Sequence, residues 1–426
     1  MKRTTLAAIA LAVTAGLGLT GCAGAAGPAE PQGQEGKTRL TVSVWNYEGT
    51  PEFKALFDGY EAANPDIDIE PVDILADDYS QKVTTMLAGG DTTDVLTMKN
   101  VTEYARYANN GQLQEINGVV DSVGKEDLAG LDAFDIGGKY YAAPYRQDFW
   151  LLYYNKELLK AAGVENPADL TWDEYSELAK KLTTTADGKT VYGTYHHIWR
   201  SVVQAIAAAQ NNGDQISGEY SFFEDQYATA LELQKSGATL DFSTAKSQKM
   251  SYRTMFETGQ TAMMPMGTWY IAGVLQAKKD GKTNVDWGLA PLPQKESNGK
   301  VSTFGSPTAF AVNKNAANSE EARKFIEWAA GEEGAKAISK IGVVPALQND
   351  AVTETYFQLE GLPSDELSKK AFTPDETALE MPVSDKSAAT DKILSQEHDL
   401  IMVGERSVSD GITEMGKRVK SEVLGQ

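Results

Sequence analysis

Hydrophobic and polar positions follow two different periods along the first hundred residues of the chain. Residues 39–45 and 67–74 place apolar side chains at every second position, which is typical of half-buried strands. Residues 51–63 and 79–88 instead space their apolar side chains three or four apart, as amphipathic helices do. A short apolar run follows at 94–98. Because strands and helices alternate in this order, the pattern predicts a parallel α/β sheet.

The rest of the chain continues this mixed pattern. Short apolar runs predict strands at 149–154, 191–195, 286–293 and 308–312, and residues 343–347 are expected to be extended. Helical spacing predicts helices at 201–210, 320–330, 385–404 and 408–419. Thr171 and Glu174 stand at capping-box spacing, so another helix is expected to begin there, with Trp172 in a packing role.

The segment 259–270 combines a strand, a turn and a helix start around one tryptophan. Residues 261–264 predict a buried strand, Gly267 permits a sharp turn, and Thr268 is expected to cap the helix that follows. Trp269 then lies at a strand-to-helix junction, which in α/β folds borders the ligand crevice. An indole offers a flat apolar face that matches the apolar face of a pyranose ring. The alternative is that Trp269 is a core anchor.

Length and composition limit the possible classes of protein. A chain of 426 residues is too long for one core, so two domains are expected. The formal net charge of −21 argues against nucleic acid and against anionic membrane surfaces as partners. With one cysteine and three histidines, no disulfide within the chain can form, and neither a metal site nor a cofactor is expected.

The N-terminus has the features of an export signal. A charged start precedes the apolar run 6–19, which is shorter than the ~20 residues that span a bilayer. The sequence Leu-Thr-Gly-Cys that ends at Cys22 resembles the bacterial lipobox. We therefore expect a signal peptide over 1–21, a lipidated Cys22 that anchors the protein to the outer face of the cell membrane, and a flexible tether over 22–38. The alternative is a chance cysteine in an ordinary signal peptide.

Polar and aromatic side chains follow two of the predicted strands. Trp45, Tyr47 and Glu48 come at the end of the first strand, and Lys99 and Asn100 come directly after the third. Because the carboxyl ends of parallel strands meet at one edge of a sheet, we expect these residues to face a ligand. Lysine and asparagine side chains can donate to hydroxyl groups. For Lys99, a solvated loop position is the alternative.

Three further segments supply candidate ligand-binding residues. Asp148 stands among aromatics beside Trp150, and a carboxylate in such surroundings needs partners, either sugar hydroxyls or Arg146. The adjacent residues His196 and His197 point in different directions and suit one metal poorly. The remaining candidates are His197 for hydrogen bonding, Trp199 for stacking, and Gly305 and Ser306 for close backbone approach to a ligand. For His197 and Trp199, a position in the core is the alternative.

The order of these motifs resembles the extracellular solute-binding proteins of ABC importers, in particular the carbohydrate-binding group that includes the maltose-binding protein. The matching features extend over about residues 39–347. They are the first strand ending at Trp45, residues 90–95, residues 144–156, residues 171–174, residues 259–269 and residues 310–314.

This resemblance implies a type II periplasmic-binding-protein fold: two α/β lobes, a ligand cleft between them and three hinge crossovers, near 147–150, 301–303 and 343–346. The first lobe would comprise 39–147 with 303–345, and the second 148–302 with 346–426. Trp269 matches the family's stacking tryptophan, and Asp148 matches a position where the family often binds hydroxyls. The implied function is to capture a sugar and deliver it to an ABC permease by hinge closure, as a monomer. Several aromatics favour an oligosaccharide.

Other classes of function make different demands on the sequence. A glycoside hydrolase needs two carboxylates about 5–10 Å apart, and only Asp148 is convincing. The chain has no Gly-x-Ser-x-Gly or P-loop motif, so we expect no enzyme activity. In a surface lipoprotein without a transport role, the aromatics would belong to the core. An amino-acid receptor could use Arg146 or Arg200 against the ligand's carboxylate.

Overall fold

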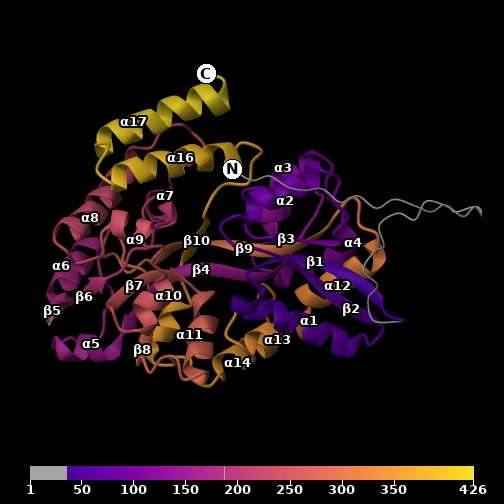
Figure 1. Ribbon diagram of the computed structural model, residues 1–426, viewed down its shortest axis with the longest axis horizontal. Coiled ribbons are helices and arrows are strands. Elements are labelled where there is room, and N and C mark those ends of the chain that lie inside the picture. The colour runs from indigo at the N-terminus through magenta and orange to yellow at the C-terminus, as the bar shows by residue number, and fades with distance from the viewer. Residues whose placement is uncertain (1–35, 187) are drawn as a thin grey trace, which may run out of the picture.

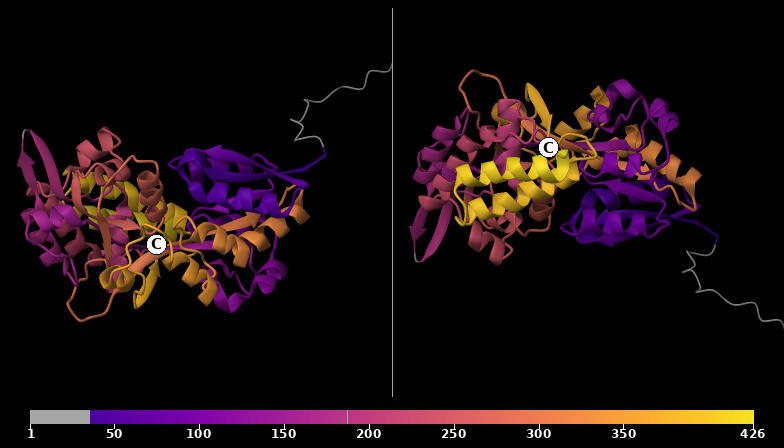
Figure 2. Two further views of the ribbon diagram at one scale, coloured as in Figure 1. Left: turned by 90° about the horizontal axis from the view of Figure 1, so that it is seen from below. Right: turned by 90° about the horizontal axis from the view of Figure 1, so that it is seen from above.

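The computed structural model describes residues 36–186 and 188–426, and its two halves meet at a narrow waist (Figures 1 and 2). The predicted signal peptide 1–21, Cys22 with its predicted lipidation, and the predicted tether up to residue 35 lie outside the described residues. In the views of Figure 2, the strands and helices gather into two bodies, and the long helix pair at the C-terminus lies along one of them.

The first half is built on the strands that the alternating pattern predicts. Strands β1 (Thr38–Trp45), β2 (Ile67–Ile74) and β3 (Val95–Met98) pair in parallel, in the order β2-β1-β3. The predicted parallel arrangement is therefore confirmed for these three strands. Strand β9 (Ser302–Val312) adds to β3 in the antiparallel direction, so the sheet as a whole is mixed.

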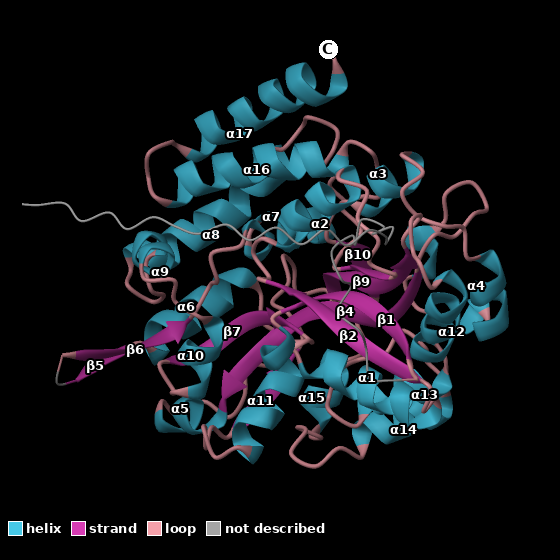
Figure 3. Ribbon diagram, turned by 45° about the vertical axis from the view of Figure 1, so that its right-hand side comes forward, coloured by secondary structure: helices cyan, strands magenta, loops and turns pink. Residues whose placement is uncertain are grey.

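Two long strands run through the waist and belong to both halves. Strand β4 (Ala143–Asn155) pairs with β9 over its first half, then with β7 (Thr261–Gly267) and β8 (Trp287–Ala290) over its second. The second half is completed by β6 (Lys189–Thr194) and the hairpin partner β5 (Thr184–Ala186), while β10 (Glu376–Leu379) pairs with β9. Figure 3 shows the helices around this continuous sheet, with the β5–β6 hairpin at one end.

Helices cover the sheet in both halves. Those of the first half are α1 (Pro51–Ala63), α2 (Tyr79–Ala88), α3 (Tyr104–Asn109), α4 (Asn117–Val123), α12 (Ser319–Ala330) and α13 (Glu332–Ser339). Those of the second are α5 (Lys156–Ala161), α6 (Trp172–Leu182), α7 (Gln204–Asn211), α8 (Glu224–Lys235), α9 (Phe242–Ser247), α10 (Tyr252–Glu257), α11 (Tyr270–Lys279), α15 (Glu366–Ala371), α16 (Ser387–Met402) and α17 (Val408–Arg418). Helix α14 (Asp350–Phe357) lies between them.

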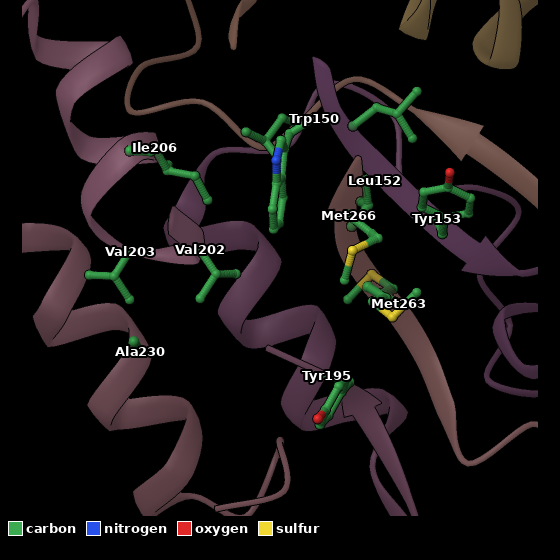
Figure 4. Close-up of a cluster of buried hydrophobic side chains, with 14 of the residues drawn as sticks. Trp150, Leu152, Tyr153, Tyr195, Val202, Val203, Ile206, Ala230, Met263 and Met266 are labelled. Atoms are coloured by element: carbon green, nitrogen blue, oxygen red, sulfur yellow. The ribbon is translucent and has the colours of Figure 1, made fainter. Parts of the chain in front are cut away.

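Each half has its own hydrophobic core. The first core is formed by β1, β3 and the inner faces of α1, α12 and α13, and the second by β4, β7 and the helices around them. Figure 4 shows part of the second core. There Trp150, Leu152 and Tyr153 of β4 are drawn with Met263 and Met266 of β7, with Val202 and Val203 just before α7, and with Ile206 of α7. Two separate cores agree with the expectation from chain length.

The chain passes from one core to the other within β4, within β9 and within α14. Tyr145 packs in the first core and Phe149 in the second, while β9 makes the reverse passage after Phe304. At the predicted third passage, 343–346, Val344 already packs with the second core, but Leu347 and Val352 return to the first, and the passage is completed between Val352 and Tyr356 of α14. Apolar packing, which local sequence does not display, sets this position.

Candidate ligand-binding site

Five aromatic side chains from separate parts of the second half gather beside the waist. The ring of Trp269 lies 5.7 Å from that of Trp150 and 6.2 Å from that of Trp199, measured between centroids. His197 lies 4.4 Å from Trp199, and Tyr252 lies 5.8 Å from the same ring. The structure thus brings four predicted site residues together and adds Tyr252, which the sequence reasoning missed.

These rings differ in how far solvent reaches them. Trp199, Trp269 and Tyr252 are half-buried and keep part of each ring open. Trp150 is only 2% exposed and is stacked on Phe304 at 5.0 Å. Trp150 therefore supports the open rings from within the core, a different role from the direct ligand contact expected of it.

The strand-to-helix junction before Trp269 is built differently from the prediction. Strand β7 continues to Gly267, and the indole of Trp269 folds back so closely that a Cβ on Gly267 would overlap it. Thr268 does not cap α11, because its buried hydroxyl donates a hydrogen bond of 2.9 Å to Asp148 instead. Glycine at 267 is thus required by side-chain packing, which positions the indole at the end of the strand.

A buried polar network crosses the waist next to these rings. Arg146 of β4 contacts Glu52 of α1 through Nη1 and Asp148 through Nε, the latter at 2.9 Å. Asp148 then accepts the hydrogen bond from Thr268. The sequence left two possible partners for Asp148, sugar hydroxyls and Arg146, and the structure shows the contact with Arg146. The network links the first half, through Glu52, to the residue before Trp269.

Burial controls the ionisation of this network. Burial raises the pKa of Glu52 and of Asp148. The guanidinium of Arg146 lowers both pKa values, but burial is the larger effect. Each carboxyl is 3% exposed and Arg146 is 7% exposed. Two carboxyls share one guanidinium, so the net charge of the cluster is zero if one carboxyl is protonated and −1 if neither is. A cluster with this charge binds the hydroxyl groups of a ligand better than it binds an anion.

The residues expected at the edge of the first sheet meet this network only in part. Trp45 is 6% exposed and packs edge-on against Phe53, while the Arg146 guanidinium lies 5.7 Å from its ring centroid. The Lys99 ammonium lies 5.5 Å from the same ring and donates to the carbonyl of Ala76, and burial lowers its pKa. Trp45 is therefore a core residue whose ring is covered by the cations of Lys99 and Arg146.

The other predicted residues of the first half lie further out. Tyr47 stacks on Phe57 at 5.9 Å, and Glu48 is exposed in the short 3-10 turn Tyr47–Gly49. Asn100 is half-buried and its side chain accepts from the backbone N–H of Thr102. Their contact with a ligand remains a prediction.

Gly305 and Ser306 lie on β9 where it pairs with β4. A Cβ on Gly305 would overlap the carbonyl oxygen of Asp148, and the carbonyl of Gly305 accepts from the N–H of Glu380. The glycine therefore serves the close approach of neighbouring strands, in place of the predicted approach to a ligand. Ser306 is half-buried and opposite Asp148 in the β4–β9 register.

Sequence reasoning also missed a carboxylate at the waist. Glu380, just after β10, accepts a hydrogen bond from the hydroxyl of Ser201, and burial raises its pKa. It lies within electrostatic range of Lys99 in the other half. The short apolar and polar run around Glu380 has no periodicity that marks a site, so the sequence carries no signal for it.

His197 is held neutral. Burial lowers its pKa to about 4, and its Nδ1 lies 3.2 Å from the hydroxyl of Tyr195. Over residues 36–186 and 188–426, no group of three or more histidine, cysteine or acidic side chains is placed to hold a metal ion. In the same part of the chain, no helix has the length and apolar character needed to cross a bilayer.

Two α/β bodies that share β4 and β9, with polar and aromatic side chains at the waist, define a two-lobe solute-binding fold of type II. Residues 46–336 match the family model described as bacterial extracellular solute-binding protein, and the chain belongs to this family.

Individual relatives agree with this assignment. A maltooligosaccharide ABC transporter solute-binding lipoprotein of Streptococcus pneumoniae (serotype 4) is 24% identical over 78% of each chain. A sugar transporter from Rhizobium etli, solved in an open conformation, is 33% identical with a TM-score of 0.75, over 90% of this chain and 99% of that one. An ABC substrate-binding protein from Listeria monocytogenes in complex with cycloalternan shares the fold, with a TM-score of 0.79 at 23% identity, over 91% and 99% of the two chains.

Proposed function

We propose that this protein is the substrate-binding component of an ABC importer and that it captures a sugar, with an oligosaccharide as the favoured ligand. The half-open rings of Trp199 and Trp269 carry the proposal, because they lie beside a polar network that joins both lobes. Flat indole faces suit the apolar face of a pyranose, and a neutral or singly negative carboxyl cluster suits its hydroxyls. The family and the names of the relatives support this chemistry.

The paired state of the arginines argues against an amino-acid ligand. A receptor for an α-carboxylate needs a cation that is free to bind it. Arg146 is already shared by Glu52 and Asp148, and Arg200 pairs with Asp391 at 2.6 Å. Both guanidinium groups are buried and compensated, so a second carboxylate would have to displace an existing partner.

Binding would draw the two lobes together. The lobes meet at β4, β9 and α14, and rotation about these passages would bring Lys99 and Glu48 of the first lobe towards a ring held on Trp199 and Trp269. We propose lobe boundaries near 147–150 and 303 on the two strands, with the third at α14. Such a hinge would move between two populations that ligand binding shifts. A transport receptor must also release its ligand, so we expect a Kd of order micromolar, roughly −8 kcal/mol.

A glycoside hydrolase is the competing function, and the second buried carboxyl, Glu52, makes it worth testing. Hydrolysis requires one carboxyl to give up its proton to the substrate and the other to act as base or nucleophile. In this protein both carboxyls are held by Arg146, which opposes such a division of roles. We therefore propose a binding protein without enzymatic activity.

A thermal-shift screen with sugars tests the proposed function, and a reducing-end assay on the same sugars tests the competing one. A ligand at 100 times its Kd adds about 2.7 kcal/mol to stability, which raises the melting temperature by several degrees. We expect maltooligosaccharides or related oligosaccharides to produce this shift, with no new reducing ends after prolonged incubation. A panel without any stabilising sugar would contradict the proposal, and the release of reducing ends would favour the hydrolase.

We also propose that Cys22 is lipidated and holds the protein on the outer face of the cell membrane, where it would serve a permease as a monomer. The extracellular character of the family and the lipoprotein name of a relative support this. A Cys22→Ser variant is expected to leave the detergent phase in a partitioning experiment and to appear in the medium. If the variant stays in the detergent phase, the anchor is not at Cys22.

A further inference from the structure

A cavity lies in the second lobe, apart from the residues of the waist. It has a volume of about 560 Å³ and opens between α6, α7 and α8 of that lobe (Figure 1). Small-molecule sites commonly have volumes of about 300–1,000 Å³. The lining includes Trp172, Phe222, Gln210 and Gln226, and it shares no residue with the candidate site at the waist.

The inner part of this cavity is aromatic and fixed in place. Trp172 is 6% exposed, and its indole N–H donates to the side-chain oxygen of Gln210 at 2.9 Å. Gln210 in turn donates to the carbonyl of Pro293 at 2.8 Å. Phe222 also lines the cavity and is half-buried, so part of it remains accessible. Phe222 therefore supplies the accessible apolar surface on which a ring could lie, and the largely buried Trp172 adds to the lining.

One polar group in the lining lacks a partner. Gln226 of α8 is 5% exposed, and its side-chain nitrogen has no hydrogen-bond partner among the described residues. A buried amide donor without an acceptor is unfavourable, so such groups are nearly always paired. A ligand that supplies a hydroxyl oxygen would satisfy it.

Most of the charged side chains at the rim have an ion-pair partner. Lys180 lies 3.1 Å from Glu177 and 3.2 Å from Glu232, and Lys295 lies 3.7 Å from Asp225. Acidic groups outnumber lysines in the lining, which disfavours phosphates and other anions. Three of the four carboxylates in the lining have a lysine partner, and Asp173 is the fourth, so the preference for a cationic ligand is reduced. The paired carboxylates can still accept bonds from hydroxyls.

We propose that this cavity is a second carbohydrate-binding site, weaker than the waist site, which takes a neutral, hydroxyl-rich ring between Trp172, Phe222 and Gln226. The ligand class is argued from the lining and does not depend on the proposed transport function. Because the site is open and makes few polar contacts, we expect it to bind in the millimolar range.

Fluorine NMR of the full protein with fluorine-labelled tryptophan tests this proposal, because the seven tryptophans report on both sites separately. Maltose at millimolar concentrations is expected to shift the Trp172 signal in the wild type and equally in Trp269→Ala. Gln226→Leu should raise the apparent Kd seen at Trp172 by about five- to tenfold. Gln234→Leu is the matched control, because Gln234 lies on the same helix outside the cavity and its amide nitrogen also has no partner in the part of the chain that the structure describes.

Three results would overturn the proposal. The first is a Trp172 signal that responds to neither maltose nor maltotriose. The second is a response that disappears in Trp269→Ala, which would show that the signal is transmitted from the waist. The third is a stronger response to spermidine than to any sugar, which would assign a cation site. Failure of the waist site would instead appear as unresponsive Trp269 and Trp199 signals, so the two proposals fail separately.

Discussion

Replacement of Arg146 by methionine removes the cation that two buried carboxylates share. Glu52 and Asp148 are each 3% exposed, and both contact the guanidinium. Removal of one partner from a buried ion pair costs about 3–5 kcal/mol, because the remaining charge is left uncompensated. We therefore expect Arg146→Met to lower the free energy of unfolding by about 4 kcal/mol at neutral pH.

The loss should depend on pH in a defined direction. Burial already raises the folded-state pKa of Glu52 and Asp148 above their ordinary values of 4.5 and 3.8, and Arg146 limits this rise. Without the arginine, both pKa values rise further, so the folded state keeps protons that the unfolded chain releases. A group of this kind contributes stability at low pH and loses it as pH rises through the folded pKa. The deficit of the variant should therefore shrink as pH falls from neutral towards 5.

Urea unfolding followed by circular dichroism measures both quantities. Lys54→Met is the control, because Lys54 pairs with Asp58 on the surface of α1 and exposed pairs contribute little. The control should unfold as the wild type does at every pH. A stability deficit in Arg146→Met below about 1 kcal/mol, or one that does not change with pH, would refute the reasoning about the network.

Two further predictions concern strand packing and the histidines. Gly305→Ala should destabilise the protein by about 1–3 kcal/mol in urea unfolding, because its Cβ would overlap the backbone of β4. Gly118→Ala is the control, because the space around Gly118 is open and no loss of stability is expected. Equal stability of the two variants would contradict the close approach of β9 to β4 at Gly305. Burial lowers the pKa of His196 and His197 to about 4 and that of His398 to about 3, so stability is present above pH 6.5 and is lost as pH falls towards these values. His398→Phe should make the fall in stability between pH 6.5 and 5 shallower, and an unchanged slope would show that this histidine is not held neutral.

Local patterns predicted the elements of the first lobe closely. The bounds of α1, β2 and α2 agree with the predicted ranges, because each has a clear period and a clear stop signal such as the Asn-Pro pair after α1. The capping box at Thr171 is present as predicted. These features depend on residues a few positions apart, which the sequence displays directly.

Contacts between distant residues could not be predicted in the same way. Thr268 looks like a helix cap in its own segment, but its hydroxyl binds Asp148, 120 positions earlier. Glu52 looks like an ordinary residue in the first turn of α1, yet it is buried against Arg146, 94 positions later. A local pattern gives each side chain its element and face, whereas the fold decides which partner it meets.

The roles of the aromatic residues divide in the same manner. Trp150 and Trp269 were both predicted to contact the ligand, but only Trp269 keeps an open ring, because Trp150 points into the core of the second lobe. Tyr252 opens a short helix and gave no signal of its own. Its place beside Trp199 follows from the packing of α10, which the sequence does not reveal.

Calorimetric titration with the sugar that stabilises the protein most is the direct test of the central claim, that open indole faces at the waist hold the ligand. Trp199→Ala and Trp269→Ala should each weaken binding by about 30-fold or more, as expected when a buried aromatic contact is removed. Trp328→Ala, a half-buried tryptophan of the first lobe, should bind as the wild type does. If both waist variants bind the sugar with wild-type affinity, the site is not where we have placed it.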